Sequence, residues 1–381
     1  MNRLFRQVHR GNLLDESSNQ YFPVEDESTT ITQPRGCQSL MTATPSESSS
    51  VTNVNLTEHS DLFQPPWLFR NGHIQTLAGT YLFGRTKDRS GLTTSVSTVG
   101  EVQVDDGDRL MYHDERPENW RPGDRVALLL HGLAGSHASP YMQRIANQLC
   151  RQNVRTFRLD WRGCGAGMSL ARLPYHSGRS DDLRAAIIEV QSRCPSSPVC
   201  LIGFSMGGNV ALKLLGESSK VDGVIRAVAV CPPIDLSETI EYINTGWARV
   251  YDAYFAKTCI RNIQHRQLVR PDAIVPEGWF TRPPRSMREF DETFTAPVCG
   301  FGSAADYYSL CSAKQFLPGI TVPTLIIAAQ DDPVVPFGPF ANAILSPTTE
   351  LRAPRHGGHL GFVTTNGPTW LDRQVIDWTI S

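Results

Sequence analysis

The clearest chemical signal in the sequence is one serine in a glycine-rich turn. Ser205 stands in the segment GFSMG (203–207), which matches the pattern Gly-x-Ser-x-Gly. The apolar residues before it, 199–202, predict a buried strand, and residues 209–215 after it predict a helix. A serine on such a strand-to-helix turn presents its hydroxyl outward, and the small glycines permit the sharp turn. This context indicates a catalytic nucleophile.

A serine nucleophile also needs N–H groups that stabilise the oxyanion of an acyl-transfer intermediate. The N–H of Met206 stands at the start of the predicted helix, where a helix N-terminus favours negative charge. A second donor is predicted in the segment HGLAGS (131–136), directly after the apolar run 126–130. Leu133 would donate through its backbone. We therefore predict an oxyanion hole formed by Leu133 and Met206.

The serine hydroxyl requires a base, and the base requires an acid that orients it. In sites built on this turn the chain order is serine, acid, histidine. The segment QDDPVVP (330–336) follows the apolar run 324–329, so two carboxylates stand where a strand ends. We favour Asp332, four residues before Pro336, by analogy of fold. Asp331 is the alternative, and its structural explanation is a carboxylate that shapes the loop.

The predicted base lies in the segment RHGGHLGF (355–362), beyond the last predicted strand at 348–353. His359 has glycines close on both sides, and a glycine-rich loop can bend back over the serine. His356 is the alternative, with a structural or solvent-facing role. His176 and Asp181 form a His-x-x-x-x-Asp pattern that is also associated with acyltransferases. The place of Asp181 in the first turn of a predicted helix already explains that residue.

Alternating strands and helices must position these residues. Short apolar runs predict strands, and helical patterns separate them: 126–130, 154–159, 199–202, 224–230 and 324–329. This alternation predicts an α/β fold with a mostly parallel central sheet and helices on both faces. Residues 93–113 predict a hairpin ahead of it, and the acidic turn at 105–108 lacks the ligand spacing of a calcium loop.

Between Pro233 and Pro323 the alternation stops. This segment is rich in aromatic residues and has helical patterns, and it is too long for a loop. We predict an inserted helical cap at about 237–318. Its aromatic side chains either pack the cap or line an apolar pocket.

The first sixty residues have a different composition. Ser, Thr, Glu, Asn and Gln dominate from Asp15 onward, and too few apolar residues are present to form a core. We predict a disordered tail at 1–60 ahead of one folded domain at 61–381. Arginines near the start suggest a targeting peptide, but no apolar segment follows them. Met41 is an alternative start of translation.

The overall composition excludes several classes of function and location. The 381 residues include 36 Lys and Arg against 38 Asp and Glu, a net charge of −2, which provides no basic field for nucleic acid. No apolar run is long enough to span a bilayer. The nine cysteines are scattered without Cys-x-x-Cys pairs, which favours a reducing, cytoplasmic location and argues against structural zinc. We predict no metal and no cofactor. The oligomeric state is not indicated.

From Pro65 onward the chain resembles the YheT-like branch of the α/β-hydrolase superfamily, which comprises bacterial esterase-like proteins and eukaryotic ABHD-type lipid hydrolases. The matching segments are PPWLFRNGHIQTL (65–77), HGLAGS, DWRGCG (160–165), YHSGRSDDL (175–183), GFSMGGN, REFDETFTAP (288–297), DYYSLCS (306–312), AAQDDP and GGHLGF. The resemblance implies an α/β-hydrolase fold and a triad of Ser205, Asp332 and His359. It also implies hydrolysis of carboxylic esters, often acylglycerols, phospholipids or short acyl esters.

These observations predict a serine carboxylesterase that acts on a small-molecule ester or lipid. An acyltransferase would use the same acyl-enzyme with an alcohol in place of water. A non-catalytic binding protein on the same fold is the alternative from another class. Such a protein would not need all three triad groups.

Overall fold

The computed structural model describes residues 63–81, 95–218, 220–365 and 369–381. The tail predicted at 1–60 and the alternative start at Met41 lie outside these residues. Among the described helices, none has the length and apolar character needed to cross a bilayer.

The core of the fold is an eight-stranded sheet in the order β1-β2-β4-β3-β5-β6-β7-β8. The first hairpin is antiparallel, and β2 pairs antiparallel with β4; the pairings from β4 to β8 are all parallel. The predicted mostly parallel sheet is confirmed. The strands are β1 (Ser95–Gln103), β2 (Arg109–Pro117), β3 (Val126–Leu130), β4 (Arg155–Asp160), β5 (Val199–Phe204), β6 (Val224–Val230), β7 (Thr324–Ile327) and β8 (Thr349–Arg352).

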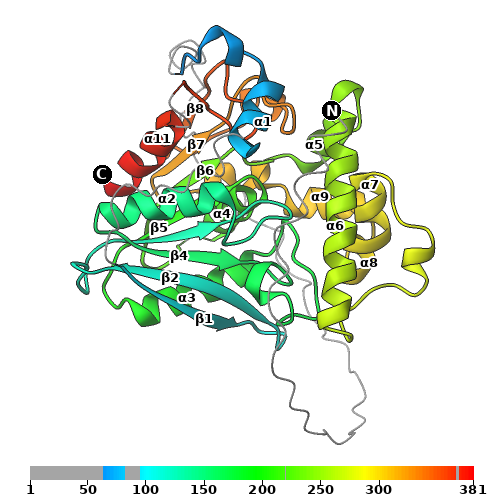
Figure 1. Cartoon of the computed structure of the whole chain (residues 1–381), viewed down its shortest axis with the longest axis horizontal. Coiled ribbons are helices and arrows are strands. Elements are labelled where there is room, and N and C mark those ends of the chain that lie inside the picture. The colour runs from blue at the N-terminus through cyan, green and yellow to red at the C-terminus, as the bar shows by residue number, and fades with distance from the viewer. Residues whose placement is uncertain (1–62, 82–94, 219, 366–368) are drawn as a thin grey trace, which may run out of the picture. The chain divides into compact units, whose positions relative to one another are not determined.

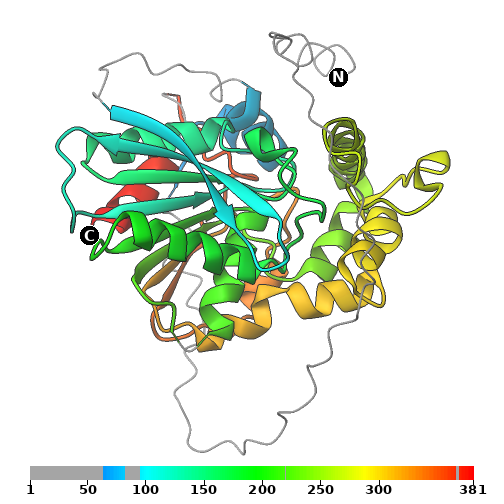
Figure 2. The same ribbon diagram turned by 90° about the horizontal axis from the view of Figure 1, so that it is seen from below.

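Helices cover both faces of this sheet, as predicted (Figure 2). Alternate residues of β3 point to opposite faces: Leu128 packs with α3 (Ser180–Arg193) and α4 (Met206–Glu217), and Leu129 packs with α2 (Pro140–Arg151) and α11 (Thr369–Ile380). Because every residue of β3 and β5 is buried, these strands are apolar throughout rather than alternating.

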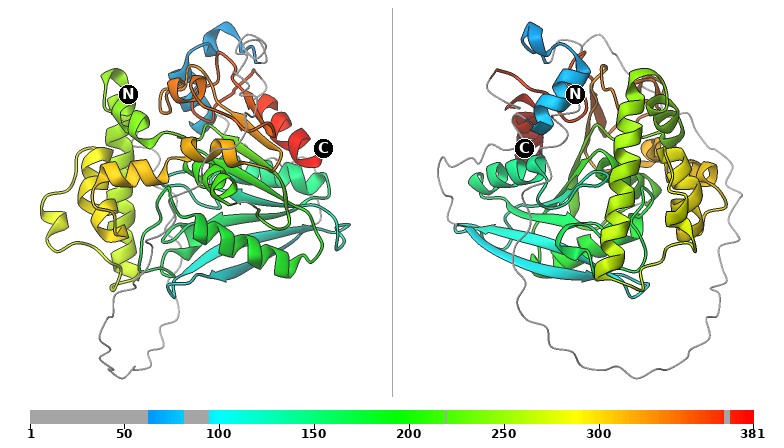
Figure 3. Two further views of the ribbon diagram at one scale, coloured as in Figure 1. Left: turned by 180° about the vertical axis from the view of Figure 1, so that it is seen from behind. Right: turned by 45° about the vertical axis from the view of Figure 1, so that its right-hand side comes forward.

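The segment between β6 and β7 is helical and lies to one side of the sheet (Figures 1 and 3). Its longest element is α6 (Arg249–Val269). The others are α5 (Leu236–Ile243), η4 (Gly246–Ala248), η5 (Trp279–Thr281), α7 (Met287–Phe290), the π-helix η6 (Asp291–Thr295), α8 (Ala296–Cys299), α9 (Ala304–Cys311) and η7 (Ala313–Gly319).

Four short elements complete the described chain: η2 (Trp67–Phe69), α1 (Gly72–Tyr81), η3 (Gly165–Gly167) and α10 (Gly338–Ala341). The segment that contains η2 and α1 carries the first motif of the family resemblance. The sequence patterns predicted no helix there.

Candidate active site

Ser205 occupies a strained turn between β5 and α4. Its backbone has φ 51° and ψ −122°, outside the regions that a serine ordinarily adopts. The Ser205 N–H donates to the carbonyl of Val230 at 2.8 Å, which ties the turn to the neighbouring strand. A Cβ at Gly203 would lie 2.5 Å from the carbonyl oxygen of Gly207, so only glycine fits there. Such strain is characteristic of functional sites held by their surroundings.

A chain of hydrogen bonds runs from Ser205 to a buried carboxylate. His359 Nε2 lies 3.0 Å from Ser205 Oγ, and His359 Nδ1 lies 2.8 Å from Asp332 Oδ2. The second oxygen of Asp332 accepts the N–H groups of Val334 and Val335 at 2.8 and 2.9 Å. Both carboxylate oxygens are therefore occupied, which fixes the orientation of Asp332 against the imidazole.

The alternative acid and the alternative base pair with each other. Asp331 Oδ2 lies 3.3 Å from His356 Nδ1, and Asp331 Oδ1 accepts the N–H of Gly358 at 2.9 Å. Burial raises the pKa of Asp331 above the usual range, against the opposing effect of these hydrogen bonds. No hydrogen bond joins either residue to Ser205 in the described chain. This outer pair connects the loop after β7 to the loop that carries His359.

The predicted oxyanion donors flank the predicted nucleophile, Ser205. The loop after β3 passes close to the serine, because a Cβ at Gly132 would lie 3.0 Å from Ser205 Cβ. Two tyrosine hydroxyls accept the N–H groups on either side of Leu133: Tyr141 binds that of Gly132 at 3.1 Å, and Tyr175 binds that of Ala134 at 2.8 Å. Within the described residues no acceptor binds the N–H of Leu133 or of Met206.

Helix α1 braces the histidine loop, and sequence reasoning assigned it no role. Thr76 Oγ1 donates to the carbonyl of Gly72 at 2.7 Å and accepts the N–H of His359 at 2.8 Å. The side-chain amide of Gln75 binds both the N–H and the carbonyl of Val363, at 2.5 and 3.1 Å. Gly358 has φ 57°, and a Cβ there would lie 2.3 Å from the carbonyl oxygen of Gly72. The backbone of α1 therefore packs directly against the backbone of the loop at Gly358.

A mostly apolar pocket opens beside Ser205, Leu133 and Met206. One face of α6 forms a wall, with Phe255, Cys259, Asn262, Ile263 and Arg266 at helical spacing. Aromatic residues from the insertion line it as well: Phe290, Phe294, Tyr307 and Tyr308.

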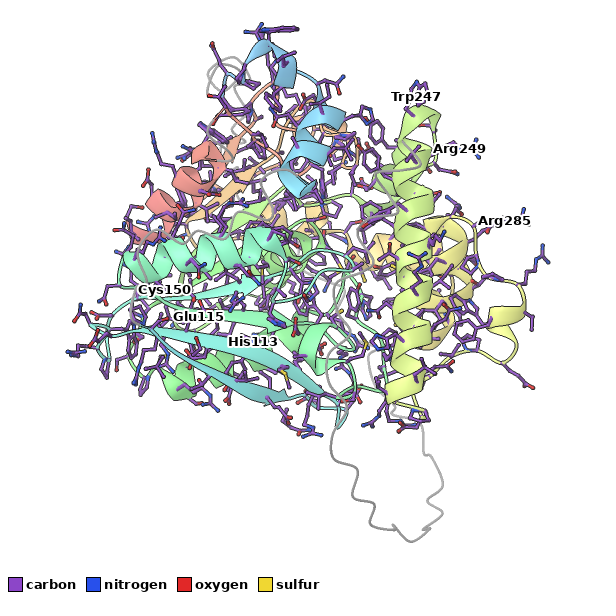
Figure 4. All side chains as sticks on the ribbon, viewed as in Figure 1. His113, Glu115, Cys150, Trp247, Arg249 and Arg285 are labelled. Atoms are coloured by element: carbon purple, nitrogen blue, oxygen red, sulfur yellow. The ribbon has the colours of Figure 1, made fainter. Side chains whose placement is uncertain are left out.

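Other aromatic residues of the insertion do not line this pocket. Trp247 lies in η4, directly before α6, with 81% of its surface exposed (Figure 4). Trp279 packs within the insertion against Phe290 and Phe294. Both roles that the sequence left open for these aromatics therefore occur in the structure.

His176 also lines the pocket, and burial lowers its pKa well below the usual value. Asp181 is exposed in the first turn of α3. No hydrogen bond or ion pair joins the two among the described residues, so the His-x-x-x-x-Asp pattern does not form a pair.

Two groups of potential metal ligands occur in the described residues. One contains Asp332 and His359, which already bind each other. The other consists of His113, His137 and Asp160, where the two imidazole rings stack with centroids 3.4 Å apart and planes 15° apart. The ligand orbitals of parallel stacked rings lie in separate planes and do not converge on one ion. In this group His137 Nδ1 lies 2.7 Å from Asp160 Oδ2.

Comparison with known proteins identifies the family of the chain. Residues 126–365 match the family described as alpha/beta hydrolase fold. The chain belongs to this family. The matched region contains the turn around Ser205, both acidic candidates and the glycine-rich histidine loop, and it excludes helix α1.

The relatives confirm the predicted resemblance. The Escherichia coli protein named "Putative esterase YheT" is 29% identical over 86% of this chain and 96% of its own length. The monoacylglycerol lipase of Saccharomyces cerevisiae is 28% identical over 64% of this chain, but the match covers only 56% of that protein. Among solved structures, the α/β hydrolase GrgF from Penicillium sp. sh18 is 19% identical with a TM-score of 0.51, over 74% of this chain and 98% of GrgF. That likeness supports the fold alone.

Proposed function

We propose that this protein is a serine hydrolase that cleaves carboxylic esters through an acyl-enzyme. The observation that carries the proposal is the continuous hydrogen-bonded path Asp332–His359–Ser205 at the edge of an apolar pocket. The names of the relatives support ester chemistry, and the yeast lipase supports a lipid-like ester.

The first half of the reaction forms the acyl-enzyme. Ser205 Oγ attacks the ester carbonyl carbon, and its proton moves to His359 Nε2. Asp332 accepts the hydrogen bond from His359 Nδ1 and stabilises the imidazolium. The carbonyl oxygen becomes an oxyanion and accepts the N–H groups of Leu133 and Met206. The C–O bond then breaks, and His359 returns the proton to the departing alcohol.

Water completes the cycle. It attacks the acyl carbon, gives a proton to His359, and forms a second oxyanion in the same position. Collapse of this intermediate releases the carboxylic acid, and the proton returns to Ser205 Oγ. The net reaction converts one ester and one water into one acid and one alcohol.

Labelling with a fluorophosphonate tests the nucleophile. We expect a single covalent adduct on Ser205, because no other serine in the described chain is hydrogen-bonded to a histidine. Ser205→Ala should abolish both the adduct and the hydrolysis of p-nitrophenyl esters while the melting temperature is retained. Labelling that survives this substitution would overturn the assignment.

Product analysis separates hydrolysis from acyl transfer. We expect free acid as the main product when an ester panel of graded acyl length is incubated with a small alcohol in water. Ester formation that outpaces acid release would make the protein an acyltransferase with the same nucleophile.

A further inference from the structure

One buried arginine in the substrate pocket lacks a counter-ion. Arg266 lies on the pocket-lining face of α6, and only 2% of its surface is exposed. In the described residues no carboxylate lies within 4.0 Å of its guanidinium. Its Nη2 donates to the carbonyl of Arg172 at 2.5 Å, and its Nε is buried without a partner.

The other three buried arginines among the described residues are arranged differently. Arg155 pairs with Asp114 at 2.6 Å, Arg158 pairs with Glu115, and Arg162 pairs with Asp182 at 2.6 Å. None of these three lines the pocket. The buried arginine without an acidic partner is therefore the one at the pocket wall.

Neighbouring groups do not neutralise Arg266. The Asp108 carboxylate is already held by Arg162 at 2.9 Å and by the N–H groups of Arg172 and Leu173. The nearby thiol of Cys299 is neutral, because burial raises its pKa to about 11. Asp291, which also lines the pocket but from η6, accepts hydrogen bonds from Thr295 and Tyr308 rather than from the arginine.

A buried guanidinium without a counter-ion is costly, by several kcal/mol for a single ion. A guanidinium stays charged in proteins, so this cost is not relieved by loss of a proton. The cost would be offset by a ligand that brings a negative charge into the pocket. Carboxylates and phosphates match the planar donor geometry of arginine.

We propose that Arg266 is an anion subsite of the substrate pocket, which binds a carboxylate or phosphate carried on the ester substrate. The proposal rests on the proposed ester hydrolysis and names the substrate class more closely. The pocket between Ser205 and Arg266 is largely apolar, so the anionic group stands at the end of an apolar chain. Along α6 the wall from Phe255 to Arg266 spans about 16 Å.

Matched esters test the subsite. Three p-nitrophenyl esters of equal acyl length would differ only at the far end of the acyl chain, which would be a methyl group, a carboxylate or a phosphate. The same set of three would be measured at several acyl lengths. We expect the wild type to favour a charged end over the methyl end in kcat/KM. Arg266→Met, which is apolar and similar in length, should lower kcat/KM for the charged ester at least about thirtyfold more than for the methyl-ended ester. Whichever charged ester gives the higher kcat/KM in the wild type shows whether the subsite favours a carboxylate or a phosphate.

A neighbouring arginine provides the control. Arg270 lies directly after the end of α6, one helical turn beyond Arg266. Its guanidinium binds Asp272 at 2.8 Å and the carbonyl of Ser169, and it lies outside the pocket. Arg270→Met should leave the ratio between charged and methyl-ended esters unchanged. Equal losses on both esters in Arg266→Met, or the same change of ratio in Arg270→Met, would overturn the subsite.

A binding measurement tests the anion subsite even if the protein does not hydrolyse esters. Decanoate and decyl phosphate should raise the melting temperature of the wild type more than decanol does, and Arg266→Met should lose that difference. This readout needs no turnover. If no ester is hydrolysed but the difference is present, ester hydrolysis fails and the anion site stands. If anions raise the melting temperature of both proteins equally, the anion site is wrong.

Discussion

Thr76 Oγ1 accepts the main-chain N–H of His359 at 2.8 Å, although the two residues are 283 positions apart in the chain. Both groups are buried. Through this bond, α1 holds the loop that carries the proposed base His359. Helix α1 itself lies outside the residues that match the family. Helix α1 thus contributes to the geometry of the proposed triad without contributing a group that takes part in the proposed reaction.

We expect Thr76→Val to impair catalysis by misplacing His359. The variant leaves a buried N–H without an acceptor, which costs about 1–3 kcal/mol. We predict a loss of about tenfold or more in kcat with little change in KM, because substrate contacts are preserved. Thr76→Ser retains the hydroxyl and should recover most of the rate. A lower melting temperature with unchanged kcat would show that Thr76 is only structural.

Sequence patterns identified the proposed reacting groups because each stands in a local signature. The glycine-rich turn around Ser205, the acidic pair after β7 and the glycines beside His359 are all recognisable within a few residues. The parallel sheet followed from short apolar runs, and the observed ends of the parallel strands lie within two residues of the predicted ones. Such differences are ordinary where strand ends fray.

Contacts between distant residues could not be predicted in this way. The bond of Thr76 to His359, and the two tyrosines beside Leu133, depend on side chains that meet only in the folded chain. No spacing within α1 identifies it as a brace. Arg266 likewise follows the helical pattern of α6, and only burial without a carboxylate partner distinguishes it.

The choice of acid can be tested by two nearly isosteric substitutions. Asp332→Asn should lower kcat by about 10⁴-fold, because the amide favours the wrong imidazole tautomer. Asp331→Asn should cost far less, since Asp331 binds His356 and Gly358 rather than His359. Steady-state kinetics of both variants, with melting temperatures as a control, make the comparison. A large loss confined to Asp331→Asn would move the acid by one residue.

Residues 1–60 are expected to be dispensable for folding and catalysis. Their composition provides too little apolar surface for a core. A chain that starts at Asp61 retains η2, α1 and every proposed site residue. It should keep the melting temperature and the kcat of the full chain. A large fall in either quantity would show that the removed residues contact the folded domain.

Asp291 should make the fold less stable as pH rises. It is buried in the π-helix after α7, and burial raises its pKa from 3.8 to about 7, against the hydrogen bonds from Thr295 and Tyr308. The folded state therefore holds a proton that the unfolded state has released between about pH 4 and about pH 7. Since stability falls wherever the folded state binds more protons, the free energy of unfolding decreases through this window. A shift of about three units corresponds to about 4 kcal/mol at most.

Asp291→Asn removes the ionisation and keeps a side chain of the same shape. The hydroxyls of Thr295 and Tyr308 can each accept as well as donate, so both can bind the amide. We expect the variant to unfold at a higher denaturant concentration than the wild type at about pH 8. The difference should shrink steadily as pH falls toward about 4. Asp181→Asn, at an exposed position on α3, controls for the loss of one negative charge. If Asp291→Asn destabilises the protein equally at every pH, Asp291 contributes a structural hydrogen bond and burial of its charge has no measurable cost.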